Sequence, residues 1–262
     1  MLTPIVAFAK DWHEDPTSNH HVLRELAKTR RVLERVDAVF AINHALADAK
    51  RAVNRATFVS PHGVDHAVFA RALDPALAVP ADLAALPAPR IGFYGTLRDW
   101  VDFPLIAHLA RARPAWSIAL IGQALGDLSA LAGLPNVHLL GQKRHDELPA
   151  YCKGFDVGMI PYRIDERMTF VNPLKLREYL SAGVPVVSTP VPEVVRYSHM
   201  CRIAATPEAF VAAVDAALTE ATPAARRARS DAMTQETWSA RVAEVMRAIA
   251  EIAQSKTQRK MR

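Results

Sequence analysis

The sequence contains few residues that could cross-link the chain or hold a metal ion. Its 262 residues include only two cysteines, Cys152 and Cys201, which give no disulfide framework and cannot form a metal cluster by themselves. Three histidines, His13, His20 and His21, lie close together, but no second cluster has matching spacing. We therefore expect a reduced, cytoplasmic setting and no metal site, and we interpret the segment around these histidines as the start of a capped helix.

Long apolar runs and targeting signals are also missing. No segment approaches the roughly 18 uninterrupted apolar residues that a membrane span needs. The N-terminal stretch MLTPIVAFAKDW has no basic region and too short an apolar run for a signal peptide. With 50% hydrophobic and 23% charged residues, the composition is that of a globular protein with ample material for a core. The length suits one large domain or two modest ones.

Several ligand-binding motifs are absent. There is no G-x-G-x-x-G after the first expected strand and no P-loop, which disfavours a dehydrogenase or a P-loop NTPase. The net charge of +5 comes partly from Arg226, Arg227, Arg229 and the tail KTQRKMR, and it suits anionic partners. No aromatic residues interleave with these cations, so we expect no nucleic-acid partner. The tail is either solvated or in peripheral contact with an anionic membrane face.

The most informative stretch is NPLKLREYLSAGVPVVST, residues 172–189. Asn172 is suited to cap a helix with Pro173 at its first position, and Gly183 is suited to end it. Lys175 and Glu178 are three residues apart and project from one face near the helix start. Such a helix start attracts phosphate, and a carboxylate can accept two hydrogen bonds from a sugar diol. The alternative is an ordinary capped helix with a solvated Lys/Glu pair.

From Pro89 onward, apolar runs alternate with helical patterns, which predicts an α/β fold with a parallel sheet covered on both faces. The expected strands are 90–94, 117–121, 137–140, 157–160, 186–188 and 202–204. The expected helices are 102–112, 123–131, 146–154 and 173–182, followed by an almost wholly helical region at 207–252.

The first part of the chain repeats this pattern on a smaller scale. We expect strands at 5–9, 38–42 and 57–60, a helix that begins near Ser18, and a second helix at 44–53. Residues 66–88 are rich in Ala, Pro and Asp and are interpreted as a linker with short helical pieces.

Glycines follow three of the expected strands. Gly95, Gly122 and Gly141 each stand where a backbone must turn sharply or approach a ligand closely. Since the carboxyl ends of parallel strands share one edge, these glycines and the helix start at Asn172 are expected to face one crevice.

These segments together resemble a known family. The stretches that carry the resemblance are IGFYGTLRDWVDFPLI, WSIALIG, NVHLLGQKRHDELPAYCKGFDVGMIPY and NPLKLREYLSAGVPVVST, with KDWHEDPTSNHH and SPHGVD in the first part of the chain. Through them, residues 89–219 resemble the donor-binding half of GT-B glycosyltransferases of the family 4 group, and the last two stretches resemble pieces of the acceptor half. The segments around residues 100–102 and 172–175 look most like bacterial enzymes of teichuronic acid or other surface-polysaccharide synthesis.

The resemblance implies that a hexosyl unit moves from a nucleoside-diphosphate sugar to a hydroxyl of a glycan or lipid-linked acceptor, without a metal or other cofactor. It implies that Glu178 binds the ribose and that the N–H groups of Leu174 and Lys175, at the Asn172 helix start, hold the diphosphate. The other implied donor-site residues are Gly95, Thr96 and Arg98 near the phosphate, and Gln142 and Lys143 near the nucleobase. His13 is a candidate catalytic residue. The expected location is cytoplasmic, either free or in peripheral contact with the inner face of the membrane.

The sequence departs from the family pattern at three positions of the donor half. Phe170 stands where the family often has a glutamate eight residues before the ribose-binding one, and Asp165 and Glu166 lie nearby at other spacings. Thr96 and Val101 stand where the family usually has an arginine and a lysine. Arg98 and Lys175 are the residues expected to compensate.

The resemblance also predicts a domain organisation: a truncated acceptor-side domain at 1–65, a linker at 66–88, a complete Rossmann-like donor domain at 89–219, and C-terminal helices with a basic tail at 220–262. An acceptor half of this fold usually has about 150 residues or more. Near residues 31–35 the sequence passes from the start of what looks like a second strand directly into the end of a helix. This pattern is interpreted as the loss of the middle of the acceptor-side domain. The leading hypothesis is therefore a glycosyltransferase, and the alternatives are a non-catalytic nucleotide-sugar-binding remnant or subunit and an epimerase of the same fold.

Overall fold

The computed structural model describes residues 6–9 and 30–260, and the chain forms two compact units. The first unit consists of residues 1–63, 169–172 and 238–262, and the second of residues 64–168 and 173–237. This division differs from the expected domains in two places. The expected linker at 66–88 belongs to the second unit, and the last helix belongs to the first. The helix expected near Ser18 lies outside the described residues.

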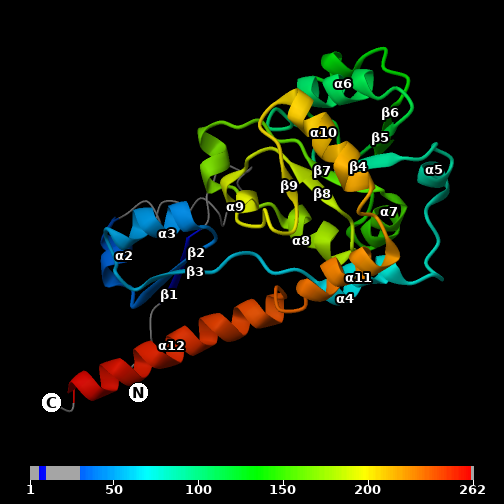
Figure 1. Ribbon diagram of the computed structural model, residues 1–262. Coiled ribbons are helices and arrows are strands. Elements are labelled where there is room, and N and C mark those ends of the chain that lie inside the picture. The colour runs from blue at the N-terminus through cyan, green and yellow to red at the C-terminus, as the bar shows by residue number, and fades with distance from the viewer. Residues whose placement is uncertain (1–5, 10–29, 261–262) are drawn as a thin grey trace. The chain divides into compact units, whose positions relative to one another are not determined.

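The first unit contains a three-stranded parallel sheet in the order β1-β2-β3 (Figure 1). Its strands are β1 (Val6–Ala9), β2 (Ala38–Ala41) and β3 (Thr57–Val59), and its helices are α2 (Arg30–Arg35), α3 (His44–Arg51) and α12 (Trp238–Lys260). The buried Asn43 starts α3, where its side chain accepts a hydrogen bond from the N–H of Leu46 at 2.8 Å. The three predicted strands are confirmed.

The second unit is built on a six-stranded parallel sheet in the order β6-β5-β4-β7-β8-β9 (Figure 1). The chain adds strands outward from β4 in one direction and then returns to add β7 on its other side. The order therefore reverses between β4 and β7, which is where open α/β sheets bind ligands. All six predicted strands are present: β4 (Arg90–Tyr94), β5 (Ser117–Ile121), β6 (Val137–Gly141), β7 (Val157–Ile160), β8 (Val186–Ser188) and β9 (Arg202–Ile203).

Helices cover this sheet on both faces. α6 and α10 lie together on one face, and α7, α8 and α11 lie on the other (Figure 1). The longer helices are α6 (Phe103–Ala112), α7 (Leu148–Gly154), α8 (Leu174–Ser181), α10 (Pro207–Leu218) and α11 (Pro223–Ala232). The short ones are α4 (His66–Phe69), η1 (Ala70–Leu73), α5 (Ala81–Ala84), η2 (Ser129–Leu131), η3 (His145–Glu147), η4 (Glu166–Phe170) and α9 (Pro192–Val195).

One helix prediction is wrong. The expected helix at 123–131 is a loop that ends in η2, because its backbone pairs with the exit of β4 instead: Leu97 donates to the carbonyl of Gln123, and Leu125 donates back to Leu97, each at 2.9 Å. The almost wholly helical region expected at 207–252 is confirmed, and it is divided into the three helices α10, α11 and α12. Thr222 and Pro223 start a new helix after α10, since the Thr222 hydroxyl caps the N–H of Ala225.

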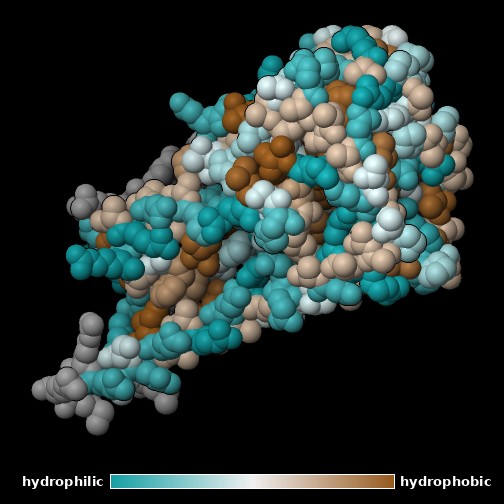
Figure 2. All heavy atoms as spheres, viewed as in Figure 1, coloured by the Kyte–Doolittle hydropathy of each residue, from teal (hydrophilic) through white to brown (hydrophobic). Residues whose placement is uncertain are grey.

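The surface mixes polar and scattered apolar residues on the face that Figure 2 shows. On α12, Trp238, Val242 and Met246 are exposed at a spacing of four residues, so they lie along one side of the helix. The described part of the chain contains no helix whose length and hydrophobicity would let it span a bilayer.

The exits of β4 and β5 approach each other closely through two glycines. Gly95 and Gly122 have φ angles of 137° and 145°, a region that side chains strongly disfavour. Gly95 donates a hydrogen bond to the carbonyl of Ile121 at 2.9 Å. A Cβ on Gly122 would lie 1.9 Å from the Gly95 carbonyl oxygen. This contact is possible only because Gly122 has no side chain.

We expect Gly122→Ala to lower the free energy of unfolding by about 3 kcal/mol or more, because strain at the positive φ adds to a steric clash with backbone. Gly133→Ala is the matched control. Gly133 has a φ of 71° with open space around its Cβ position, so only the strain of about 1–2 kcal/mol applies. Urea denaturation followed by circular dichroism measures both, and equal losses would contradict the close approach at Gly122.

Candidate functional site

The candidate site lies at the carboxyl edge of the six-stranded sheet, where β4 ends and α8 begins. β4 ends at Tyr94, directly before Gly95, and β7 leads through Pro161 to Tyr162. α8 begins at Leu174 and carries three charged side chains in its first five residues, of which Lys175 and Glu178 are the predicted site residues. These segments border the point where the strand order reverses.

Glu178 is held at this edge by two side chains. The hydroxyl of Tyr94 donates to Oε2 at 2.8 Å, and Nε2 of His145 lies 3.1 Å from Oε1. The Glu178 side chain is 11% exposed, whereas that of His145 is 65% exposed. A buried carboxylate is costly unless its oxygens have partners, so these two contacts account for its position. One partner lies in the protein interior and the other at the surface.

Tyr94 is itself fixed by aromatic contacts and by the backbone. Its ring meets that of Tyr179 edge to face, with centroids 4.8 Å apart, and its N–H donates to the Tyr179 hydroxyl at 3.1 Å. Burial, reinforced by the negative charge of Glu178, holds the pKa of Tyr94 well above its usual value. The phenol therefore stays protonated and remains a donor to the carboxylate.

Lys175 places a cation beside the glycine at the end of β4. Its ammonium donates to the hydroxyl of Tyr162 and lies 5.3 Å and 5.0 Å from the ring centroids of Phe93 and Tyr162. A Cβ on Gly95 would come within 3.3 Å of the Lys175 Nζ atom. The open space at Gly95 therefore lets the lysine reach the strand exit.

The start of α8 differs from its prediction. Pro173 is the N-cap without a side-chain hydrogen bond, and the Asn172 amide instead donates to the carbonyl of Ile42 at 2.8 Å, within the first unit. Asn172 is thus not the helix cap. The first N–H groups of an α-helix have no acceptor within it, so those of Leu174 and Lys175 point out of the end of α8.

The remaining predicted site residues either have other partners or are exposed to solvent. Lys143 forms an ion pair with Asp82 at 2.7 Å, so its charge is used on the segment before β4. Arg98 lies over the Trp100 ring, 5.7 Å from its centroid. Thr96 and Gln142 are exposed after β4 and β6. His13 lies outside the described residues.

Two of the positions that depart from the family pattern, Phe170 and Val101, have structural roles in this chain. Phe170 packs against the core of the first unit, and Val101 is buried and pairs with Tyr162 in an isolated bridge. Asp165 is bound by Arg167 at 2.7 Å, and Glu166 is exposed.

Sequence reasoning missed three residues of this site: Tyr94, His145 and Tyr162. Each stands within five residues after a strand or at its last position. A census of polar side chains at the ends of β4, β6 and β7 would have found them. Their pairing with α8 is a tertiary contact that no local pattern encodes.

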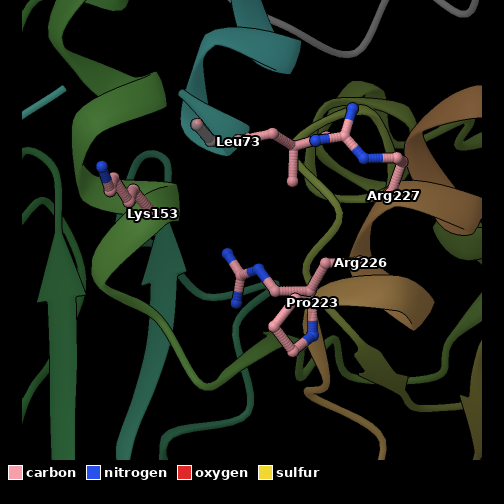
Figure 3. Close-up of a pocket in the computed structure, with 6 residues that line it drawn as sticks. Leu73, Lys153, Pro223, Arg226 and Arg227 are labelled. Carbon is pink, nitrogen blue, oxygen red and sulfur yellow. The ribbon is translucent and has the colours of Figure 1, made fainter. Parts of the chain in front are cut away.

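Away from this edge, a hollow of about 320 Å³ is lined by three cations, two of which form structural contacts (Figure 3). Lys153 donates to the carbonyls of Asp74, Pro75 and Leu77 at 2.6–3.0 Å, which uses its three donors. Arg226 donates to the carbonyls at the end of α7. The remaining lining residues are Ala72, Leu73, Pro223 and Arg227. Among the described residues, no group of His, Cys, Asp and Glu is placed to hold a metal ion.

The fold and the site define a two-unit α/β protein with a ligand edge at the switch point of its larger sheet. Residues 88–220, just over half of the chain, match the family described as Glycosyl transferases group 1, and the chain belongs to this family. It is 38% identical over 106 residues to TuaH of Bacillus subtilis (strain 168), provisionally named a teichuronic acid biosynthesis glycosyltransferase. That match covers 39% of this chain and 27% of the relative, so the chain corresponds to about a quarter of the relative's length.

Solved structures show the same fold at low sequence identity. Anabaena HepE, crystallised in complex with UDP and glucose, is 18% identical with a TM-score of 0.64, over 97% of this chain and 71% of that one. Sucrose-phosphate synthase from Thermosynechococcus elongatus is 16% identical with a TM-score of 0.66, over 95% of this chain and 68% of that one. These likenesses confirm the predicted GT-B type of α/β fold.

We expect Tyr94→Phe to lower the free energy of unfolding by about 1–3 kcal/mol, because it leaves a buried carboxylate oxygen without its donor. Tyr151→Phe is the matched control, since Tyr151 donates to Asp82, whose side chain is 36% exposed and can turn to water. Its expected cost is below about 1 kcal/mol. Thermal or urea unfolding compares the two, and a larger loss in Tyr151→Phe would refute the dependence of Glu178 on Tyr94.

Proposed function

We propose that this chain transfers a sugar from a nucleoside-diphosphate sugar to an acceptor hydroxyl, with the donor bound in residues 89–219. The observation that carries the proposal is the position of Glu178. A carboxylate with one oxygen fixed from the interior stands five residues into a helix whose N-terminus and lysine border the switch point. Family membership supports this assignment.

Glu178 would bind the ribose of the donor. Each carboxylate oxygen can accept more than one hydrogen bond, so Oε2 can keep Tyr94 while the carboxylate accepts from a vicinal diol. Tyr94 and the aromatic contacts behind it hold the carboxylate in one orientation, and a preorganised acceptor loses less entropy on binding.

The start of α8 would bind the diphosphate. Phosphate binding needs hydrogen-bond donors and positive charge, which are available from the outward N–H groups of Leu174 and Lys175 and from the Lys175 ammonium. The absence of a side chain at Gly95 leaves space for the phosphate beside them. Negative charge builds on the diphosphate as the glycosidic bond breaks. Donors fixed in advance would stabilise that charge in the transition state. Thr96 and Arg98, which follow on the same loop, would line the phosphates.

The donor is proposed to be a UDP-sugar, because HepE, which shares the fold, was crystallised with UDP. Gln142 would lie near the base. Lys143 would join it only by leaving Asp82. The name of TuaH supports a glycan or lipid-linked acceptor in cell-surface polysaccharide synthesis. A cytoplasmic location with peripheral contact through the basic residues near the end of α12 fits this role. His13 remains the candidate for catalysis.

We expect Glu178→Gln to weaken binding of UDP by about 1–3 kcal/mol, because a charged acceptor of the ribose is lost. Glu166→Gln, an exposed glutamate that begins η4, is the matched control and should bind UDP as the wild type does. Isothermal titration calorimetry measures both. Wild-type protein should also bind 2′-deoxy-UDP more weakly than UDP, and Glu178→Gln should reduce this difference.

Equal affinities in the wild type and Glu178→Gln would sink the ribose assignment. Transfer itself is tested separately, by incubating the full chain with a radiolabelled UDP-sugar and following release of UDP. UDP binding without release of the sugar to water or to any acceptor would favour a non-catalytic nucleotide-sugar-binding protein.

We expect binding of UDP-glucose to be unchanged by EDTA, because Lys175 and the α8 N-terminus would neutralise the diphosphate in place of a metal ion. Lys175→Met should weaken UDP-glucose binding and remain equally insensitive to EDTA. Calorimetry with and without the chelator is the measurement. A loss of affinity on adding EDTA, restored by Mg²⁺ or Mn²⁺, would contradict metal independence.

A further inference from the structure

The two partners of Glu178 differ sharply in how they are held. Tyr94 is 5% exposed and is fixed by Tyr179 through both its ring and its N–H. His145 stands in the short helix η3 with 65% of its side chain exposed, and its imidazole meets the Phe69 ring edge to face at 5.4 Å. The first contact is fixed within the core, whereas the second lies at the surface and can open without disturbing the core.

His145 also occupies the acceptor that a ligand would need. Oε2 of Glu178 faces the interior with Tyr94, and Oε1 is 3.1 Å from His145 Nε2. With only 11% of the Glu178 side chain exposed, a diol that approaches this carboxylate from solvent meets an exposed imidazole already bonded to it. The imidazole and a sugar hydroxyl cannot both donate a hydrogen bond to the same lone pair of Oε1.

We propose that His145 is a displaceable cover of the donor site, which pairs with Glu178 in the free protein and gives way when a ribose diol binds. The proposal rests on the proposed function, because it takes Glu178 as the ribose acceptor. Tyr94 keeps the carboxylate oriented while the imidazole leaves. His145 thus sets the affinity for the donor without belonging to the reaction.

This cover responds to pH. Glu178 on α8 and Asp146 on its own segment interact with His145, which Arg144 directly precedes in the chain. α4 contributes the neutral Phe69 ring. Arg144 binds Asp146 at 2.9 Å, and this hydrogen bond is the main cause of the lowered pKa of Asp146. Imidazoles gain their charge as pH falls from about 8 to 5. Protonation strengthens the pair with Glu178, so donor affinity should fall toward acidic pH.

The experiment is calorimetric titration of the full chain with UDP-glucose at pH 5.5 and 7.5. UDP-glucose is used because its diphosphate has no terminal phosphate that titrates in this range, whereas that of UDP does so near pH 6. Wild-type affinity should rise about two- to fivefold with pH, the size expected for a half-exposed ion pair. His145→Ala should bind more tightly than the wild type at pH 5.5 and show no rise.

His145→Gln keeps a neutral donor to Glu178, so its affinity should be independent of pH and lie below that of His145→Ala. His108→Ala removes a half-exposed histidine from α6 and should keep the wild-type rise. Circular dichroism establishes that each variant is folded.

The outcomes distinguish a failure of the proposed role of His145 from a failure of the proposed function. No binding of UDP-glucose by the wild type at either pH overturns the proposed function. Binding that needs Glu178 but is unchanged in His145→Ala at both pH values overturns the cover. Weaker binding in His145→Ala at both values also overturns it, because His145 would then contact the donor.

Discussion

The hydrogen bond from Tyr94 to Glu178 is the contact on which the organisation of the site depends. It joins the last residue of β4 to the middle of α8, two elements that are separated by three strands in the chain but lie next to each other across the switch point. An ionised carboxylate that is almost buried is stable only when donors reach it. The raised pKa of Tyr94 ensures that its donor is present at every physiological pH.

The site also depends on residues that have no side chain. Gly122 allows the exits of β4 and β5 to touch, and Gly95 leaves the space into which Lys175 extends. The lysine and the carboxylate are three residues apart on α8, so one helix presents both. The proposed phosphate-binding cation and the proposed sugar-binding acceptor therefore both follow from the position of one helix against one strand exit.

The sequence predicts the strands around this site better than the long-range hydrogen bonds that position its residues. β5, β7 and β8 are short apolar runs in a β/α alternation and are buried along their whole length, so hydrophobicity alone locates them. Residues 123–131 looked helical, but their backbone found partners on the β4 exit. Asn172 had the side chain of a cap, yet its amide bonds to Ile42. In both cases a long-range hydrogen bond replaced the local one.

The same distinction explains why the sequence predicts that Glu178 and Lys175 share one helix face but does not predict the partners of Glu178. Glu178 and Lys175 lie within one helix, where spacing determines which face they share, and the ribose-binding role of Glu178 stays a prediction from the family resemblance. Tyr94 and His145 reach it from positions 84 and 33 residues away. Only the fold brings one to the buried oxygen and the other to the exposed one. That difference in burial, rather than the identity of the residues, fixes one contact within the core and leaves the other open to competition from a ligand.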